Sequence, residues 1–263
     1  MTRAMNDRTV KLSGGVLMPL LGFGTWQITG KQAYLAVRTA VDAGYRLFDT
    51  ATMYGNEAQI GRALAECGVP QEEFFITTKL PPRRMGRALE TLTESLSALR
   101  VDHLDLWLIH WPSGGASPKT WEQMIAAREN GLTRAIGVSN YTAALIDELT
   151  AATGVTPQVN QIEWGPSLYN PAVVVQHRER GVVLEGYSPF KTTNLRHPTL
   201  QEIADKHGVS TAQVVVRWHI EHGFVVIPKS ARPERIRSNA DVYGFSLTED
   251  EVARIDAMAG GHR

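Results

Sequence analysis

Short apolar runs alternate with longer amphipathic segments along most of the chain. The segments between the runs, such as 33–44, 57–68 and 87–100, repeat apolar residues at intervals of three and four, which predicts helices. The apolar runs are too short for helices and end at polar residues, which predicts β-strands. The predicted strands are 20–24, 45–49, 74–79, 104–110, 134–139, 158–162, 182–187 and 224–228.

Alternation of strands and helices is typical of a parallel sheet, because each helix carries the chain back to the start of the next strand. The chain has 263 residues, and a closed (β/α)8 barrel takes about 250. We therefore expect an α/β fold, a (β/α)8 TIM barrel, as a single domain over 1–263. The segment 9–20 alternates around Gly14-Gly15, which predicts a β-hairpin closing the barrel bottom. Two helices are expected within 198–222, and a last one, with Thr248 and Glu251 as a capping box, within 246–260.

Composition and charge argue against several kinds of binding partner, such as nucleic acid, membranes and metal ions. Lys plus Arg and Asp plus Glu are 27 each, so no net field attracts nucleic acid or an anionic membrane. Cys67 is the single cysteine, and a helix residue is the simplest interpretation of it, so we expect no disulfide and no metal site. No signal-like or membrane-length apolar run is present. We expect a cytoplasmic monomer with no obligate protein partner.

Three successive predicted strands lead to ionisable side chains. Asp49 and Tyr54 follow the second strand, Lys79 ends the third and His110 ends the fourth. Each alone has a structural explanation: a turn cap for Asp49, a solvated strand end for Lys79, a buried core residue for His110. The carboxyl ends of barrel strands meet at one face, so we expect the four together. An ammonium lowers the pKa of a neighbouring phenol, which would help Tyr54 to protonate a carbonyl oxygen.

Short sequence strings of interest lie along nearly the whole chain: LGFGTW, GYRLFDTATMYGNE, ITTKL, DLWLIHWP, RAIGVSN, VNQIEW, GYSPF, AQVVVRW and IPKSARPERIRSN. In this order they resemble the motifs of the aldo-keto reductases, most closely those of short bacterial members of the 2,5-diketo-D-gluconate reductase type. The resemblance implies that Tyr54 is the general acid in carbonyl reduction, supported by Asp49, Lys79 and His110, with hydride supplied by a nicotinamide cofactor.

The expected cofactor site differs from a dinucleotide-binding fold. Gly22-x-Gly24 lacks the third glycine of that fingerprint. Arginine and lysine around Pro233, a residue suited to a first helical turn, favour a 2′-phosphate and so NADPH over NADH. By resemblance, the cofactor residues are Gly24, Thr25, Trp26, Ser139, Asn140, Gln161, Tyr187, Ser188, Phe190, Lys229, Ser230, Arg232, Arg235 and Asn239.

The expected substrate pocket has an apolar wall and open surroundings. Its residues are Trp26, Met53, Tyr54, His110 and Trp111. The chain departs from the family pattern at Pro81, where an aromatic is common after the lysine strand, and at Gly165, where a histidine is common. The loops after His110 and Tyr187 are short, so we expect a shallow pocket, broad reduction of small carbonyls such as keto-sugar acids or methylglyoxal, and fast cofactor exchange.

Two other functions compete with this one. The first is an NADPH-binding redox-sensing module with slow turnover, but no added partner-binding insertion is evident. The second is a barrel hydrolase that uses Glu163 and Glu185 as paired carboxylates. It would leave the grouping of Asp49, Tyr54, Lys79 and His110 unexplained.

Overall fold

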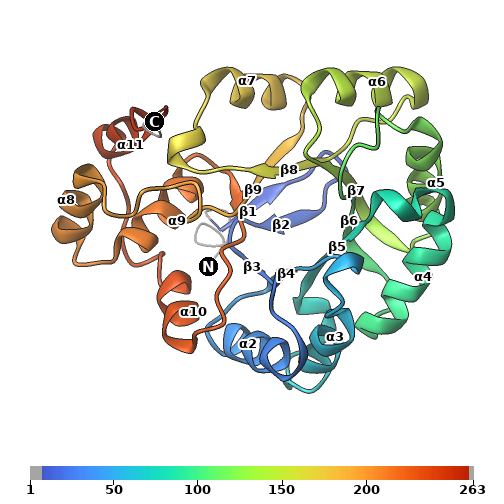
Figure 1. The fold of residues 1–263 in the computed structure, drawn as a ribbon, viewed down its shortest axis with the longest axis horizontal. Helices are drawn as coiled ribbons and strands as arrows, with labels where there is room; N and C mark the ends of the chain where they lie inside the picture. The colour runs from blue at the N-terminus through green and yellow to red at the C-terminus, as the bar shows by residue number, and fades with distance from the viewer. Residues whose placement is uncertain (1–7, 261–263) are drawn as a thin grey trace.

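Eight parallel strands form a closed ring within residues 8–260, the part of the chain that the computed structural model describes (Figure 1). Neighbouring strands pair in chain order, and a bridge between Leu21 and Val226 joins the last strand to the first. The predicted (β/α)8 barrel is therefore confirmed. The strands are β3 (Gly22–Gly24), β4 (Leu47–Asp49), β5 (Phe75–Leu80), β6 (Leu104–Ile109), β7 (Thr133–Ser139), β8 (Val159–Glu163), β9 (Val183–Tyr187) and β10 (Val225–Val226).

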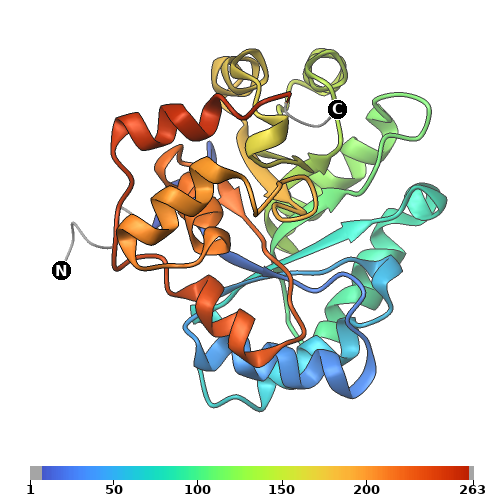
Figure 2. The ribbon, with the colours of Figure 1, turned by 60° about the vertical axis from the view of Figure 1, so that its left-hand side comes forward.

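Helices surround the ring, and the chain returns through them from each strand to the next (Figure 1). Two helices, α8 (Pro198–His207) and α9 (Thr211–Glu221), separate β9 from β10, and with α11 (Glu249–Asp256) they enclose a second apolar core. These three helices lie together at one side of the barrel (Figure 2). The predicted capping box of Thr248 and Glu251 begins α11. The helices are α2 (Gly30–Asp42), α3 (Glu57–Ala65), α4 (Ala88–Leu99), α5 (Pro118–Glu129), α6 (Ala143–Thr153), α7 (Pro171–Glu179), α8 (Pro198–His207), α9 (Thr211–Glu221), α10 (Pro233–Ala240) and α11 (Glu249–Asp256).

The predicted hairpin is present and lies across the ring in Figure 1. It consists of β1 (Thr9–Lys11) and β2 (Leu17–Pro19), which pair antiparallel. Its Leu12 and Met18 side chains are fully buried in the main core. The turn approaches Gln158, which precedes β8, so the hairpin covers the amino ends of the strands.

The strands bury their side chains on both faces, which explains their continuous apolar sequences. β5 and β6 are buried at every position. β10 is shorter than the predicted 224–228: the Phe224 N–H bonds back to the His219 carbonyl at 2.9 Å, and Pro228 has no N–H to donate to the ladder. Ionisable side chains occur where the strands reach the carboxyl face of the barrel, and there they form the candidate site. No helix within residues 8–260 is long and apolar enough to cross a membrane.

Candidate active site

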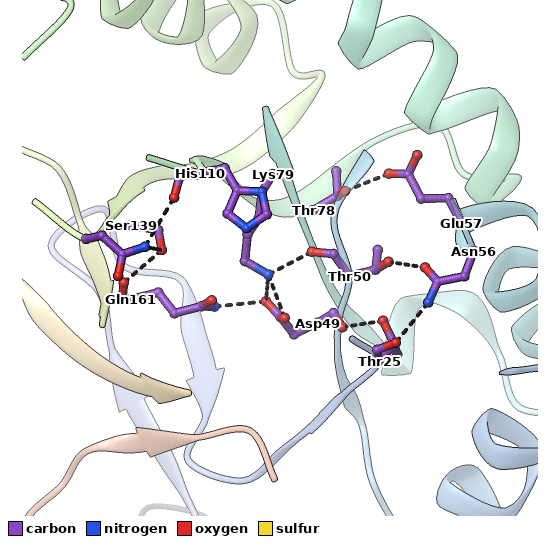
Figure 3. A network of polar contacts seen from close by, with 11 residues as sticks. Thr25, Asp49, Thr50, Asn56, Glu57, Thr78, Lys79, His110, Ser139 and Gln161 are labelled. Atoms are coloured by element: carbon purple, nitrogen blue, oxygen red, sulfur yellow. Dashed lines mark hydrogen bonds and ion pairs between the residues drawn. The ribbon is translucent and has the colours of Figure 1, made fainter. Parts of the chain in front are cut away.

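A buried ion pair connects two neighbouring strands at the carboxyl end of the barrel. Asp49 ends β4, and Lys79 lies one residue before the end of β5. The Lys79 Nζ lies 2.6 and 2.7 Å from the two carboxylate oxygens of Asp49 and donates a third bond to the Thr50 carbonyl at 2.8 Å (Figure 3). The three donor positions of the ammonium are thus occupied, which is what a fully buried lysine requires.

Charge on the pair is maintained by mutual attraction. Burial by itself lowers the pKa of Lys79, but the Asp49 carboxylate, together with Tyr54 and Glu185, outweighs burial and holds the lysine pKa above its ordinary value. Burial raises the pKa of Asp49, and the Lys79 charge and the Gln161 amide oppose that rise. Lys79 is therefore a fixed cation inside the barrel.

Tyr54 stands above this cation in a short 3₁₀ turn, Thr52–Tyr54, that follows β4. The Thr52 hydroxyl donates to the Lys79 carbonyl at 3.0 Å, which anchors the turn to β5. Lys79 Nζ lies 5.2 Å from the centroid of the Tyr54 ring. The lysine lowers the pKa of the phenol, as expected, but burial raises it by more, so the net pKa lies above its ordinary value. Tyr54 is therefore protonated at neutral pH and can donate a hydrogen bond.

His110 lies beside Tyr54 at the end of β6, with the two rings 5.7 Å apart and inclined at 74°. Its backbone N–H donates to the Leu80 carbonyl at 3.0 Å, which continues the β5–β6 ladder. Burial, with a smaller effect of Lys79, lowers the pKa of His110 to about 3. Its Nδ1 atom is enclosed and has no partner within residues 8–260. The ring is therefore neutral, with one N–H available as a donor.

Amide and hydroxyl groups complete the other side of the site. Gln161 of β8 donates to Asp49 Oδ2 at 2.9 Å and accepts from Ser139 Oγ at its backbone carbonyl at 2.8 Å. Asn140 donates to Ser139 Oγ at 2.9 Å, and the Tyr187 hydroxyl donates to Asn140 Oδ1 at 2.9 Å. These contacts tie the ends of β7, β8 and β9 to the ion pair.

Asn56 is a structural residue of the site that the sequence analysis did not single out. It is fully buried, and its Nδ2 donates to the carbonyls of Thr25 at 2.9 Å and Ile28 at 2.8 Å. Its Oδ1 accepts from Thr50 Oγ1 at 2.8 Å. It therefore joins the loops after β3 and β4 and sets the position of Thr25 (Figure 3). The only hint in the sequence was its place in the string YGNE.

A cavity of about 730 Å³ opens above the ion pair. The five predicted substrate residues all line it. Trp26, Met53 and Trp111 are 46, 51 and 45% exposed, which excludes simple core packing for them. Ten predicted cofactor residues also line the cavity: Gly24, Thr25, Trp26, Ser139, Asn140, Gln161, Tyr187, Ser188, Phe190 and Lys229. Lining residues that were not predicted for the cofactor or the carbonyl substrate are Gln27, Glu163, Pro189, Lys191 and Ile227.

Four predicted cofactor residues lie outside the cavity lining: Ser230, Arg232 and Arg235 are at or near the start of α10, and Asn239 is near its end. Pro233 occupies the first turn, as predicted, and the N–H groups of Arg235 and Ile236 bond to the Arg232 carbonyl at 3.1 and 3.0 Å. Arg232 and Arg235 are exposed, and the Ser230 hydroxyl accepts from the Arg232 N–H at 3.1 Å. Asn239 is buried on the inner side of the helix. The assignment of these residues to a phosphate stays a prediction.

The loop after β9 lies close to the end of β8 because Gly165 has no side chain. A Cβ at that position would approach the hydroxyl oxygens of Thr192 and Thr193 to 2.9 Å. Lys191 of the same loop lies 3.5 Å from the Glu163 carboxylate. The departure from histidine at Gly165 therefore lets this short loop pack down on the barrel.

The two glutamates considered for a hydrolase do not form an accessible pair. Glu185 is completely buried, whereas Glu163 lies at the cavity rim beside Lys191. A carboxylate pair for glycoside hydrolysis must flank the substrate on both sides. This geometry does not provide one.

Comparison with known proteins agrees with the site. The sequence profile of the Aldo/keto reductase family matches residues 20–259. The chain belongs to the aldo-keto reductase family. It is therefore an oxidoreductase of the kind that acts on carbonyl compounds with a nicotinamide cofactor.

Among similar proteins, 2,5-diketo-D-gluconic acid reductase B of Corynebacterium sp. (strain SHS752001) is 43% identical, over 97% of this chain and 95% of its own. Methylglyoxal reductase DkgA of Escherichia coli O157:H7 is 38% identical, over 98% of this chain and 96% of its own. Among solved structures, a Bombyx mori aldo-keto reductase in complex with NADP has a TM-score of 0.90 and is 34% identical, over 97% of this reductase and 94% of that chain.

Proposed function

We propose that this reductase transfers hydride from NADPH to small aldehydes and ketones, with Tyr54 as the proton donor. One observation carries the proposal: a protonated phenol and a neutral imidazole lie side by side at the inner end of one cavity, above a buried cation. A carbonyl oxygen that gains negative charge needs donors of this kind, already oriented and shielded from water.

Each member of the group has a distinct task in the proposed reaction. His110 and Tyr54 donate hydrogen bonds to the carbonyl oxygen, and Tyr54 gives up its proton as the alcohol forms. Lys79 stabilises the phenolate that remains, because it lies 5.2 Å from the ring centroid and is held charged by Asp49. The nicotinamide supplies the hydride when it is bound.

The residues of the site fit a dinucleotide with a 2′-phosphate. A Cβ on Gly24 would lie 2.8 Å from the Ile227 carbonyl, so the strand at this end of the cavity is kept free of side chains. Lys229 lines the cavity, and Arg232 and Arg235 are exposed at the start of α10. Guanidinium groups and a helix N-terminus suit a phosphate dianion. The NADP bound to the Bombyx mori relative supports the same choice.

The substrates are proposed to be small or broad-range carbonyl compounds. Trp26, Met53 and Trp111 form an exposed apolar rim, which favours aldehydes and ketones with a compact or apolar group. The relatives named for diketogluconate and methylglyoxal reduction support this class and make those two compounds the first to test.

The central experiment follows NADPH oxidation by absorbance with methylglyoxal, an aromatic aldehyde, a diketo sugar acid and a plain ketone. Tyr54→Phe removes the proton donor and leaves the ring, so we expect kcat to fall by at least about 100-fold. NADPH binding, measured through the fluorescence of the tryptophans at the cavity, should be retained. Tight NADPH binding without turnover of any carbonyl would instead support the redox-sensing alternative.

Cofactor preference is tested with Arg235→Ala. Loss of a charged hydrogen bond to the 2′-phosphate should weaken NADPH binding about 10–100-fold and leave NADH binding unchanged. Arg62→Ala provides a control, since this exposed arginine of α3 pairs with Glu66, just beyond the end of the helix. Equal weakening of NADH and NADPH by Arg235→Ala would contradict the phosphate assignment.

A further inference from the structure

One ionisable residue of the barrel interior has no place in the proposed chemistry. Glu185 is the central residue of β9, is 0% exposed, and lies in register with Gln161 on β8 and Val225 on β10. Neither of its carboxyl oxygens has a hydrogen-bond partner within residues 8–260. A buried polar group without hydrogen-bond partners lowers the stability of the fold, so its presence here indicates a role other than stability.

The surroundings of Glu185 favour its neutral form. Burial raises its pKa to about 8, and the nearby Asp49 charge adds to the rise. The neighbouring Gln161 amide, which itself bonds to Asp49, and the Lys79 charge oppose the rise. Glu185 also raises the pKa of Tyr54, the remaining titratable group near it. On its other side, β10 places the apolar Val225 beside Glu185. Glu185 is therefore protonated at pH 7.

Gln161 links this carboxyl to the ion pair. Its Nε2 donates to Asp49 Oδ2 at 2.9 Å, and its backbone is paired with that of Glu185. A charge on Glu185 would therefore lie next to Gln161, the residue whose amide orients Asp49. Asp49 in turn holds Lys79.

We propose that Glu185 tunes the charge of the reductase site: it lies beside Gln161, whose amide holds Asp49, and its ionisation adds negative charge next to the Asp49–Lys79 pair and Tyr54. The consequence for turnover rests on the proposed function of Tyr54. A nearby anion raises the pKa of a phenol, and Glu185 acts on Tyr54 in that direction. Ionised Glu185 therefore keeps Tyr54 protonated to higher pH and extends carbonyl reduction on the basic side.

The test compares the pH profile of carbonyl reduction for the native enzyme and Glu185→Gln, which keeps the shape and removes the charge. We expect kcat/KM at pH 7 to change less than about twofold. At alkaline pH, kcat/KM declines as the proton donor loses its proton. In Glu185→Gln this decline, the basic limb of the profile, should begin about one pH unit lower, so that kcat/KM above the limb is about tenfold smaller than in the native enzyme. Asp105→Asn is the matched control, because this buried carboxyl lies against Ile76 and Arg134, away from the site. It should leave the limb in place.

A second readout does not require turnover. Infrared difference spectra during a pH titration should show a protonated carboxyl band that disappears near pH 8 and is absent in Glu185→Gln. If the band behaves so but no carbonyl is reduced, the proposed function fails and the state of Glu185 stands. If Glu185→Gln does not fold, Glu185→Met offers an uncharged side chain of similar length for the same comparison. An unmoved basic limb, or a titrating band that survives the substitution, overturns the proposal.

Discussion

Replacement of Lys79 by Met tests the buried ion pair directly. Methionine has a similar length and an unbranched stem, so it fills the site with little change in shape. It removes the ammonium that lies 2.6 Å from Asp49 and makes three hydrogen bonds. Asp49, with a side chain only 3% exposed, is then left with the single bond from Gln161.

The expected loss follows from the burial of the remaining carboxylate. Breaking a buried pair by removal of one partner costs about 3–5 kcal/mol of unfolding free energy. For a domain of this size, that lowers the melting temperature by about 10 °C. Asp49 in Lys79→Met has a pKa raised by burial, so the folded state binds a proton more readily than the unfolded chain. The deficit should therefore shrink as the pH falls from 7 toward 4, by up to about 1.4 kcal/mol per unit.

The assay is urea unfolding followed by circular dichroism at pH 7 and pH 4.5. Asp49→Asn combined with Lys79→Met removes both charges and should recover about 1–3 kcal/mol of the loss. Lys191→Met is the matched control, since this lysine is 71% exposed and its pairing with Glu163 is worth less than about 1 kcal/mol. A loss for Lys79→Met no larger than for Lys191→Met, or one that grows as the pH falls, would refute the reasoning.

Three further predictions concern the loops and the outer helices. Asn56→Ala removes a fully buried amide that joins two loops and should cost about 3 kcal/mol in chemical denaturation, whereas a cost below 1 kcal/mol would contradict the bonding described. Gly165→Ala places a Cβ 2.9 Å from two threonine hydroxyls, so it should cost about 1–3 kcal/mol and speed NADPH release in stopped-flow fluorescence; unchanged release would show that the loop adapts. Glu251 has its pKa lowered to about 2, since bonds from Lys206, Thr248 and His207 outweigh its burial. Glu251→Gln should therefore lose at most about 3 kcal/mol at pH 7, and the difference from the native enzyme should vanish as the pH falls from 4.5 through 2.

The arrangement of strands and helices was predictable because it depends on local patterns. Strands buried on both faces are continuously apolar, and helices between them repeat apolar residues at three and four. The hairpin around Gly14-Gly15 and the capping box of Thr248 and Glu251 follow from turn and cap chemistry that involves few residues. Strand ends were less certain, since the length of β10 depends on which partners its N–H groups find.

The sequence predicted which side chains gather in the candidate site, but it did not predict their pKa values. Asp49, Lys79 and His110 each end a strand, and strand ends converge in any barrel of this kind. The net rise in the pKa of Tyr54 could not be deduced, because burial had to be weighed against the Lys79 charge. The same holds for the neutral state of His110.

By itself, the sequence determined the barrel, the order of its units and the four side chains at its carboxyl face, because periodicity and strand ends are written in consecutive residues. Only the tertiary structure decided how Asn56 joins two loops, how Gly165 admits the loop after β9, and that Glu185 is fully buried beside Gln161. These features depend on distances between segments far apart in the chain and on how much water is excluded there. Neither quantity is carried by the local pattern of residues.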